Sequence, residues 1–185
     1  DARLFIVATE DTHAPSMYLR LFQNTRIKVH VLPTTDGFSA PGHVMERLDS
    51  FHAEYDLMND DELWLMLDVD HWADADHVQN FRDVCSEALR KGYQLAHSNP
   101  CFELWLLLHL IDLDENDDLP ACADVKALLK QELGGYGKNR ISQENFPPET
   151  IKSALRRAEC IDRKPDDRWP QCTGTHVYRL VKKLV

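Results

Sequence analysis

The chain has 185 residues, of which 43% are hydrophobic, which excludes a disordered chain and fits one domain with a proper core. No run approaches the roughly 18 consecutive apolar residues of a membrane span. The amino end also lacks the pattern of a signal peptide, so we expect a cytoplasmic protein without membrane contact. The formal net charge of −10 argues against a generic nucleic-acid coat protein.

Strands and helices alternate in the first hundred residues. Short apolar or alternating runs predict strands at residues 3–9, 26–32, 63–67 and 93–97. Amphipathic segments between them predict helices at residues 15–23, 43–55 and 76–91. This βαβαβαβ order predicts a parallel sheet of about four strands with helices on both faces.

Beyond Pro100 the pattern changes, and every segment reads as helix or loop. Helices are predicted at residues 102–111, 121–133, 149–160 and 176–184. We therefore expect an α/β core over residues 1–111. A helical carboxyl-terminal extension over residues 112–185 is expected to pack on it within a single domain.

Acidic residues follow two of the predicted strands. Asp68 and Asp70 end the apolar run of residues 63–67, and residues two apart on an extended chain face the same way. Glu10 follows the first strand, and parallel strands bring their carboxyl ends to one edge of the sheet. Mg²⁺ takes oxygen ligands, so these three acids predict metal-assisted phosphoryl chemistry. The structural alternative is that Asp70 or Asp74 caps the next helix and Glu10 is a loop charge.

Other polar residues are candidates for the same edge of the sheet. His71 could contact a substrate, although a lone histidine at such a place is more often a surface or capping residue. Ser98 and Asn99 end the fourth strand. Glu103 is the acid of a very apolar helix, where it either caps the helix amino terminus or serves as a further metal or substrate ligand. Lys138 follows a glycine-rich segment and could reach a phosphate, while the segment itself is more typical of a helix stop.

Cysteine content and charge distribution add two expectations. Five cysteines, an odd number without a C-x-x-C pair, argue against a disulfide framework and a structural zinc site. Residues 1–125 carry 8 basic and 24 acidic residues, against 13 and 7 in residues 126–185, so the two parts have net charges of −16 and +6. The acidic part could collect divalent cations and the basic tail could contact phosphates. A basic helical surface without such a role explains the tail equally well.

The string S-N-P-C-F-E-L-W-L-L-L-H that begins at Ser98, together with Asp68-Val69-Asp70, closely resembles the RloB-like proteins. These form a prokaryotic defence family related to the Toprim (topoisomerase–primase) fold. The likeness extends to the opening strand with Glu10, to Tyr136-Gly137-Lys138 and to Thr175-His176-Val177. The resemblance thus covers most of the chain.

This resemblance implies a Toprim-like nuclease in which Glu10, Asp68 and Asp70 hold Mg²⁺ or Mn²⁺. Its substrate would be a phosphodiester bond of DNA or RNA. Ser98 and Glu103 would support the site, with Glu103 as a further ligand, and Lys138 would stabilise charge on the phosphate. The resemblance also implies abortive-infection defence and a partner ATPase of the ABC or AAA type.

Two other functions fit the sequence. The first loop of the family usually reads Glu-Gly, whereas Asp11 follows Glu10 here, which favours a catalytically silent regulatory or scaffold subunit that binds an ATPase. A receiver-like phosphoacceptor domain also gathers acids at a sheet edge around Mg²⁺. A homo-oligomer is compatible with each of these functions, and the sequence does not determine the oligomeric state.

Overall fold

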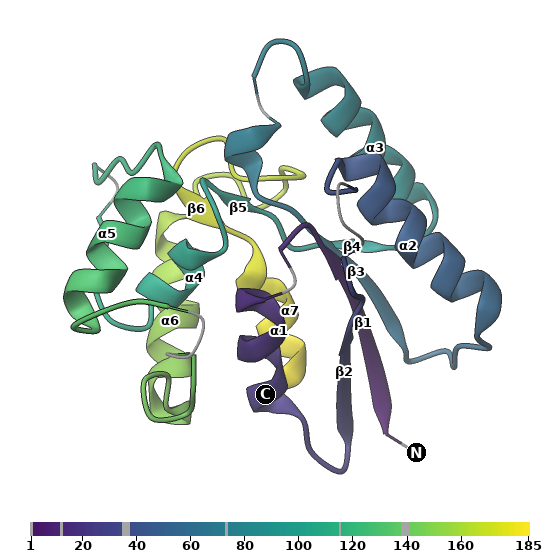
Figure 1. Cartoon of the computed structure of the whole chain (residues 1–185), viewed down its shortest axis with the longest axis horizontal. Coiled ribbons are helices and arrows are strands. Elements are labelled where there is room, and N and C mark those ends of the chain that lie inside the picture. Colours follow the sequence, from purple (N-terminus) through teal and green to yellow (C-terminus); the bar gives the residue numbers. More distant parts are fainter. Residues whose placement is uncertain (1, 12, 35–37, 73, 115, 138–140) are drawn as a thin grey trace.

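A parallel four-stranded sheet forms the centre of the molecule (Figure 1). The computed structural model describes residues 2–11, 13–34, 38–72, 74–114, 116–137 and 141–185. The strands lie in the order β2-β1-β3-β4 and comprise β1 (Arg3–Thr9), β2 (Ile27–Val31), β3 (Glu62–Met66) and β4 (Gln94–Leu95). The α/β prediction is therefore confirmed. Within the described ranges, no helix is long and apolar enough to cross a membrane.

Side chains of β1 alternate between two hydrophobic cores. Phe5 and Val7 pack on one face of the sheet, whereas Ile6 and Ala8 pack on the other. A strand that is buried on both faces needs apolar residues at successive positions, which explains the unbroken runs in β1 and β3. The two strands pair in parallel up to Thr9↔Met66, so the segments that follow them leave the sheet at the same edge.

Helices cover both faces of the sheet, as predicted. One face carries α2 (Pro41–Glu54) and α3 (Val78–Arg90), while α1 (Ala14–Leu19) and α7 (Val177–Leu184) lie across the other face (Figure 1). A 3₁₀ turn, η1 (Arg20–Phe22), continues α1.

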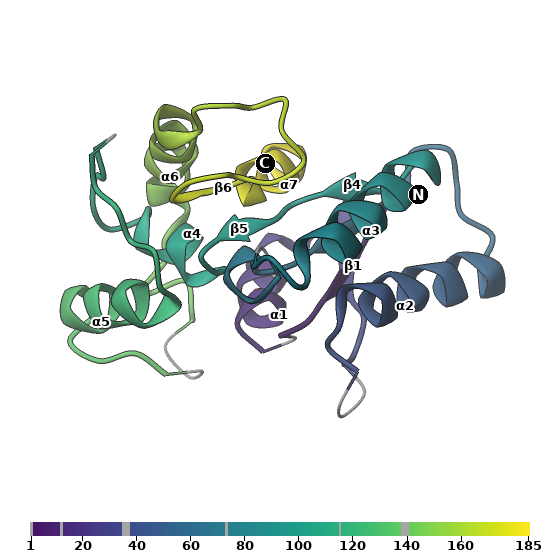
Figure 2. The same cartoon turned by 90° about the horizontal axis from the view of Figure 1, so that it is seen from above.

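The helices of the carboxyl-terminal part share a hydrophobic core with the sheet. They comprise α4 (Glu103–Leu107), α5 (Cys122–Glu132), α6 (Pro148–Ile161) and α7. Figure 2 shows α4, α5 and α6 gathered at the end of the molecule away from α2. Buried residues of all four helices pack in the cluster that contains Phe5 and Val7. Each predicted helix has a counterpart, although α4 is shorter than the predicted 102–111.

A two-stranded antiparallel ladder lies beside the main sheet and was not predicted. It pairs β5 (Ser98–Asn99) with β6 (Gly174–Thr175), so the expectation of only helix and loop beyond Pro100 is wrong at residues 174–175. The fourth strand is also shorter than the predicted 93–97, because β4 comprises only Gln94–Leu95, and β5 follows it from Ser98. Strands of two residues are too short to show a period in the sequence.

His97 connects β3 to the segment between β4 and β5. Its Nδ1 accepts a hydrogen bond from the Leu67 N–H at 3.0 Å, and its Nε2 lies 3.4 Å from Cys85 Sγ. Because Nδ1 accepts from a backbone amide, the neutral ring carries its proton on Nε2. Burial lowers the pKa of His97 to about 3, so the ring stays neutral. Leu67, which lies between the end of β3 and Asp68, is thereby held in place.

The cysteine content gave a misleading expectation about disulfides. Cys101 and Cys122, 21 positions apart, form a disulfide with their Cα atoms 5.5 Å apart. Sequence spacing does not reveal this pairing, since it depends on the chain after α4 returning to the start of that helix. Cys85, Cys160 and Cys172 are free thiols.

Candidate functional site

The candidate site lies where the chain leaves β1 and β3 at the carboxyl edge of the sheet. Glu10 directly follows β1. The strand β3 ends at Met66, so Asp68 and Asp70 lie beyond it, Asp68 in extended backbone and Asp70 in the 3₁₀ turn η2 (Val69–His71). The placement of the two aspartates therefore comes from a tight turn and not from the alternation of a strand.

Glu10 is tied to the loop that carries the aspartates. Its Oε1 accepts a hydrogen bond from the Asp68 N–H at 2.6 Å, and its Oε2 accepts one from Trp72 Nε1 at 3.1 Å. Burial raises the pKa of Glu10, while these two hydrogen bonds oppose that rise. The structure thus brings the end of β1 into contact with the loop after β3.

Asp68 points toward the start of α4. Its Oδ1 accepts a hydrogen bond from the Phe102 N–H at 2.9 Å. Burial raises the pKa of Asp68 well above the ordinary value, and the nearby charges of Glu10 and Glu103 raise it further. A carboxylate in this environment is stabilised by any cation that binds beside it.

Asp70 has a carboxylate oxygen without a conventional partner. Its Oδ1 is buried and, within the described part of the chain, receives no hydrogen bond. The His71 ring lies near it, with Nε2 3.6 Å from Asp70 Oδ1 and Nδ1 3.8 Å from Glu10 Oε2. The His71 side chain is 65% exposed, so it lies on the solvent side of both acids. A buried carboxylate oxygen without a donor is a place where a cation fits.

Glu103 lies in the first turn of α4 and contacts a different set of residues. Its side chain is 7% exposed, and its Oε1 accepts a hydrogen bond from the Tyr136 hydroxyl at 3.3 Å. Lys126 Nζ lies 3.4 Å from the same oxygen. Glu103 is thus partnered by protein groups, although its charge acts on Asp68.

The remaining sequence candidates are in the small ladder or outside the described residues. The Ser98 hydroxyl is hydrogen-bonded to that of Thr175 at 2.7 Å. Asn99 Nδ2 donates to the Pro170 carbonyl at 3.0 Å, and the residue lines a cavity of about 520 Å³ together with Asp114, Asn116, Asp117 and Asp118. Lys138 lies outside the described residues.

The three predicted ligands do not form the tightest group of donors. Among the described residues, the group of three whose donor atoms all lie within 4.8 Å of one another is Cys101, Glu103 and Cys122. Mg²⁺ is commonly held by one or two carboxylates with water completing its shell. Asp68 and Asp70 fit that requirement, with Glu10 close by and already hydrogen-bonded.

Sequence reasoning missed two supporting residues. Trp72 holds Glu10, and its position two residues after Asp70 was the available signal. Arg47, in α2, donates to the Thr9 carbonyl at 2.7 Å and to the Pro33 carbonyl at 2.8 Å. It fixes the edge where Glu10 leaves the sheet, and nothing in the helical pattern of α2 pointed to it.

Comparison with known proteins agrees with the sequence motifs. The family model described as RloB-like protein matches residues 5–184. No curated protein and no solved structure matches the chain. The match takes in Glu10, both aspartates and the segment around Glu103, along with nearly all of the fold. The chain therefore belongs to the RloB-like family.

Proposed function

We propose that this protein is a Toprim-like nuclease, dependent on Mg²⁺ or Mn²⁺, that cleaves phosphodiester bonds of DNA or RNA in antiphage defence. Family membership supports the proposal, as do the three carboxylates at one edge of a parallel sheet. The observation that carries it is the buried Asp70 Oδ1 without a hydrogen-bond donor in the described part of the chain. A divalent cation would compensate that oxygen and the neighbouring charges.

Each acid has a proposed part. Asp68 and Asp70 would hold the cation, and Glu10 would be a third ligand or a general acid/base whose position its two hydrogen bonds define. The cation would polarise the phosphate and lower the pKa of an attacking water. His71, exposed beside Asp70, would contact the substrate, and Lys138 would stabilise charge that develops on the phosphate.

The test is cleavage of plasmid DNA and transfer RNA by purified protein with Mg²⁺ or Mn²⁺. Asp70→Asn removes the charge and keeps the shape, so we expect at least about a 100-fold loss of cleavage, because metal assistance contributes several kcal/mol. Asp76→Asn, at an exposed acid further along the same loop, is the matched control and should cleave as the wild type does. Equal cleavage by Asp70→Asn and wild type would refute the assignment.

A catalytically silent subunit is the second candidate. Both Glu10 oxygens already accept hydrogen bonds from protein groups, and Asp11 replaces the usual glycine, which together favour it. In this case the chain would bind a partner ATPase of the ABC or AAA type and cleave nothing. The same cleavage assay distinguishes the two candidates when it is repeated with a partner ATPase of the ABC or AAA type, since a scaffold would stay inactive with its partner present.

A further inference from the structure

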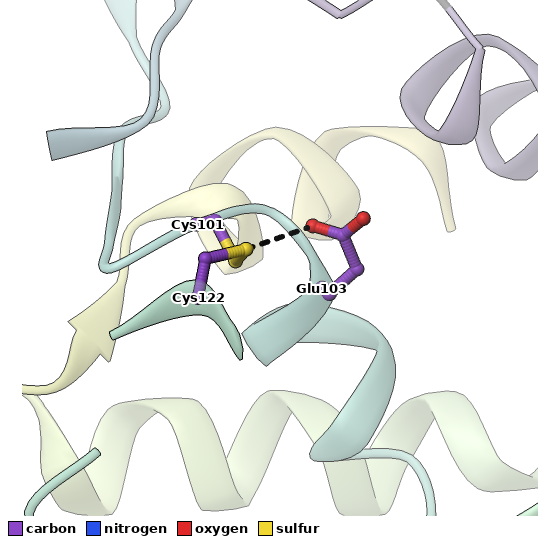
Figure 3. A group of neighbouring side chains, drawn as sticks. All are labelled: Cys101, Glu103 and Cys122. Atoms are coloured by element: carbon purple, nitrogen blue, oxygen red, sulfur yellow. Dashed lines mark hydrogen bonds between the residues drawn. A yellow bond between two sulfur atoms is a disulfide. The ribbon is translucent and has the colours of Figure 1, made fainter. Parts of the chain in front are cut away.

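Two cysteines and one glutamate form a compact group beside the carboxylate site. Cys101 precedes α4, Glu103 lies in its first turn, and Cys122 opens α5 (Figure 3). We call these three residues the Cys–Glu cluster. One sulfur or oxygen atom from each lies within 4.8 Å of the other two. Cys101 is 1% exposed and Glu103 is 5% exposed, so this donor set is largely shielded from solvent.

The two oxygens of Glu103 have different surroundings. Oε1 receives the Tyr136 hydroxyl at 3.3 Å and lies 3.4 Å from Lys126 Nζ. Oε2 faces the sulfurs instead, 3.8 Å from Cys122 Sγ, along the dashed line in Figure 3. A disulfide sulfur carries no proton, so it offers this oxygen no hydrogen while the bond is closed. Carboxylates that bind metal ions are typically hydrogen-bonded by neighbouring groups. Tyr136 has this relation to Oε1 of Glu103, while Oε2 faces the sulfur atoms.

We propose that the Cys–Glu cluster, when its disulfide is reduced, is a binding site for a thiophilic divalent cation such as Zn²⁺. A dithiol reductant would give two electrons and two protons to the Cys101–Cys122 bond and become a disulfide itself. The cation would then displace both thiol protons and bind two thiolates and Glu103 Oε2. Three protein ligands leave a fourth tetrahedral position for water. Thiolates select zinc-like ions over Mg²⁺, which distinguishes this cluster from the carboxylate site.

The cluster and the carboxylate site share one short segment. Phe102 lies between Cys101 and Glu103, and its N–H is the donor to Asp68 Oδ1. The Glu103 charge also acts on Asp68. A cation bound to Glu103 would offset that charge. Metal binding to the cluster, which requires a reduced disulfide, would therefore change the electrostatic environment of Asp68. The binding site itself does not depend on the proposed nuclease activity.

Cobalt(II) is the probe, because thiolate ligands give bound Co²⁺ a charge-transfer absorption that oxygen ligands do not. The full-length protein is reduced with dithiothreitol, freed of reductant without oxygen, and titrated with Co²⁺. We expect the reduced wild type to develop this absorption at an equimolar ratio and to lose it when Zn²⁺ is added. The oxidised wild type should show none, and this comparison needs no substitution. Reduced protein that is folded by circular dichroism and gives no such absorption would overturn the proposal.

Variants test the three ligands. Cys101→Ser and Cys122→Ser should each abolish the absorption, whereas the double variant Cys160→Ser/Cys172→Ser, at exposed free thiols, should retain it. Glu103→Gln should weaken Co²⁺ binding by at least about tenfold, the size of effect that metal-site partners have. Asp70→Asn should develop the same thiolate absorption as the wild type, because Asp70 is not part of the cluster. Failure of the nuclease proposal therefore leaves this test intact. Unchanged binding by Glu103→Gln, or absorption that survives in Cys122→Ser, would contradict the three-ligand site.

Discussion

At the scale of single residues, burial and charge repulsion both act on the carboxylate site. Burial is the main cause that raises the pKa of Asp68, and the nearby charges of Glu10, Glu103 and Asp70 raise it further. Its hydrogen bond from Phe102 opposes the shift without cancelling it. Folding therefore favours the protonated form of Asp68, which costs stability at neutral pH when no cation is bound.

The amide variant Asp68→Asn should therefore be more stable than the wild type in the presence of a chelator. Asparagine keeps an oxygen for the Phe102 N–H and removes the charge. We expect the melting temperature at neutral pH to rise by about 2–4 °C, the change that roughly 1 kcal/mol gives in a chain of this size.

The raised pKa of Asp68 also predicts that the stability difference between Asp68→Asn and the wild type depends on pH. A raised carboxyl pKa costs the folded state nothing below the unfolded pKa, and the cost grows as pH rises through the folded value. The gain from Asp68→Asn should accordingly shrink toward acidic pH. A variant that melts below the wild type at neutral pH in chelator would show that the charge is compensated within the protein.

At the scale of elements, the sequence was most informative where a pattern extends over many residues. The apolar run before Asp68 and the amphipathic helices α3, α6 and α7 were predictable, because burial imposes a period on them. The ladder of β5 and β6 was not, since each strand has two residues. The hydrogen bond from Asp68 N–H to Glu10 and the Cys101–Cys122 pairing were equally hidden, because both depend on which loops meet in space.

Gly92, which follows the last residues of α3, can be tested against Gly42, which lies within α2. After α3, the Gly92 N–H bonds to the Leu89 carbonyl and the Tyr93 N–H to the Ala88 carbonyl, and Gly92 has φ of 84°. This helix end favours glycine at Gly92, because other L-residues are strained there. Gly42 lies inside α2, and neither glycine has an atom within 4 Å of an added Cβ.

We expect Gly92→Ala to lower the free energy of unfolding by about 1 kcal/mol, because alanine is strained at positive φ. Gly42→Ala should raise it by about 0.5 kcal/mol through reduced backbone entropy of the unfolded chain. Urea unfolding measures both. Similar changes in the two variants would mean that backbone conformation does not decide their effects.

At the scale of the whole molecule, buried histidines link stability to pH. Burial is the main cause that lowers the pKa of His97 to about 3 and those of His109 and His176 to about 4. An unfolded histidine binds a proton near pH 6.5, whereas these three stay neutral in the folded chain. Their contribution to stability is therefore complete at neutral pH and is lost as pH falls toward their folded values.

His109→Gln tests this linkage. Glutamine retains a donor and an acceptor for Thr150 and Tyr18, the partners of the His109 ring, but does not titrate. Between about pH 6 and pH 4.5 the variant should lose less stability than the wild type, by up to about 1.4 kcal/mol per pH unit. Chemical unfolding across this range provides the comparison. Parallel curves would exclude His109 from the acid response.

The loop after β3 has its backbone amides secured on several sides. Leu67 donates to His97, Asp68 donates to Glu10, and the Asp70 N–H donates to the Pro100 carbonyl at 3.2 Å. The conformational entropy of such a segment is lost during folding, so metal binding does not have to order it. The aspartates are in this sense preorganised. Crystals soaked with and without Mn²⁺ should superpose closely over this loop, and association should be governed by ion dehydration more than by rearrangement of the chain.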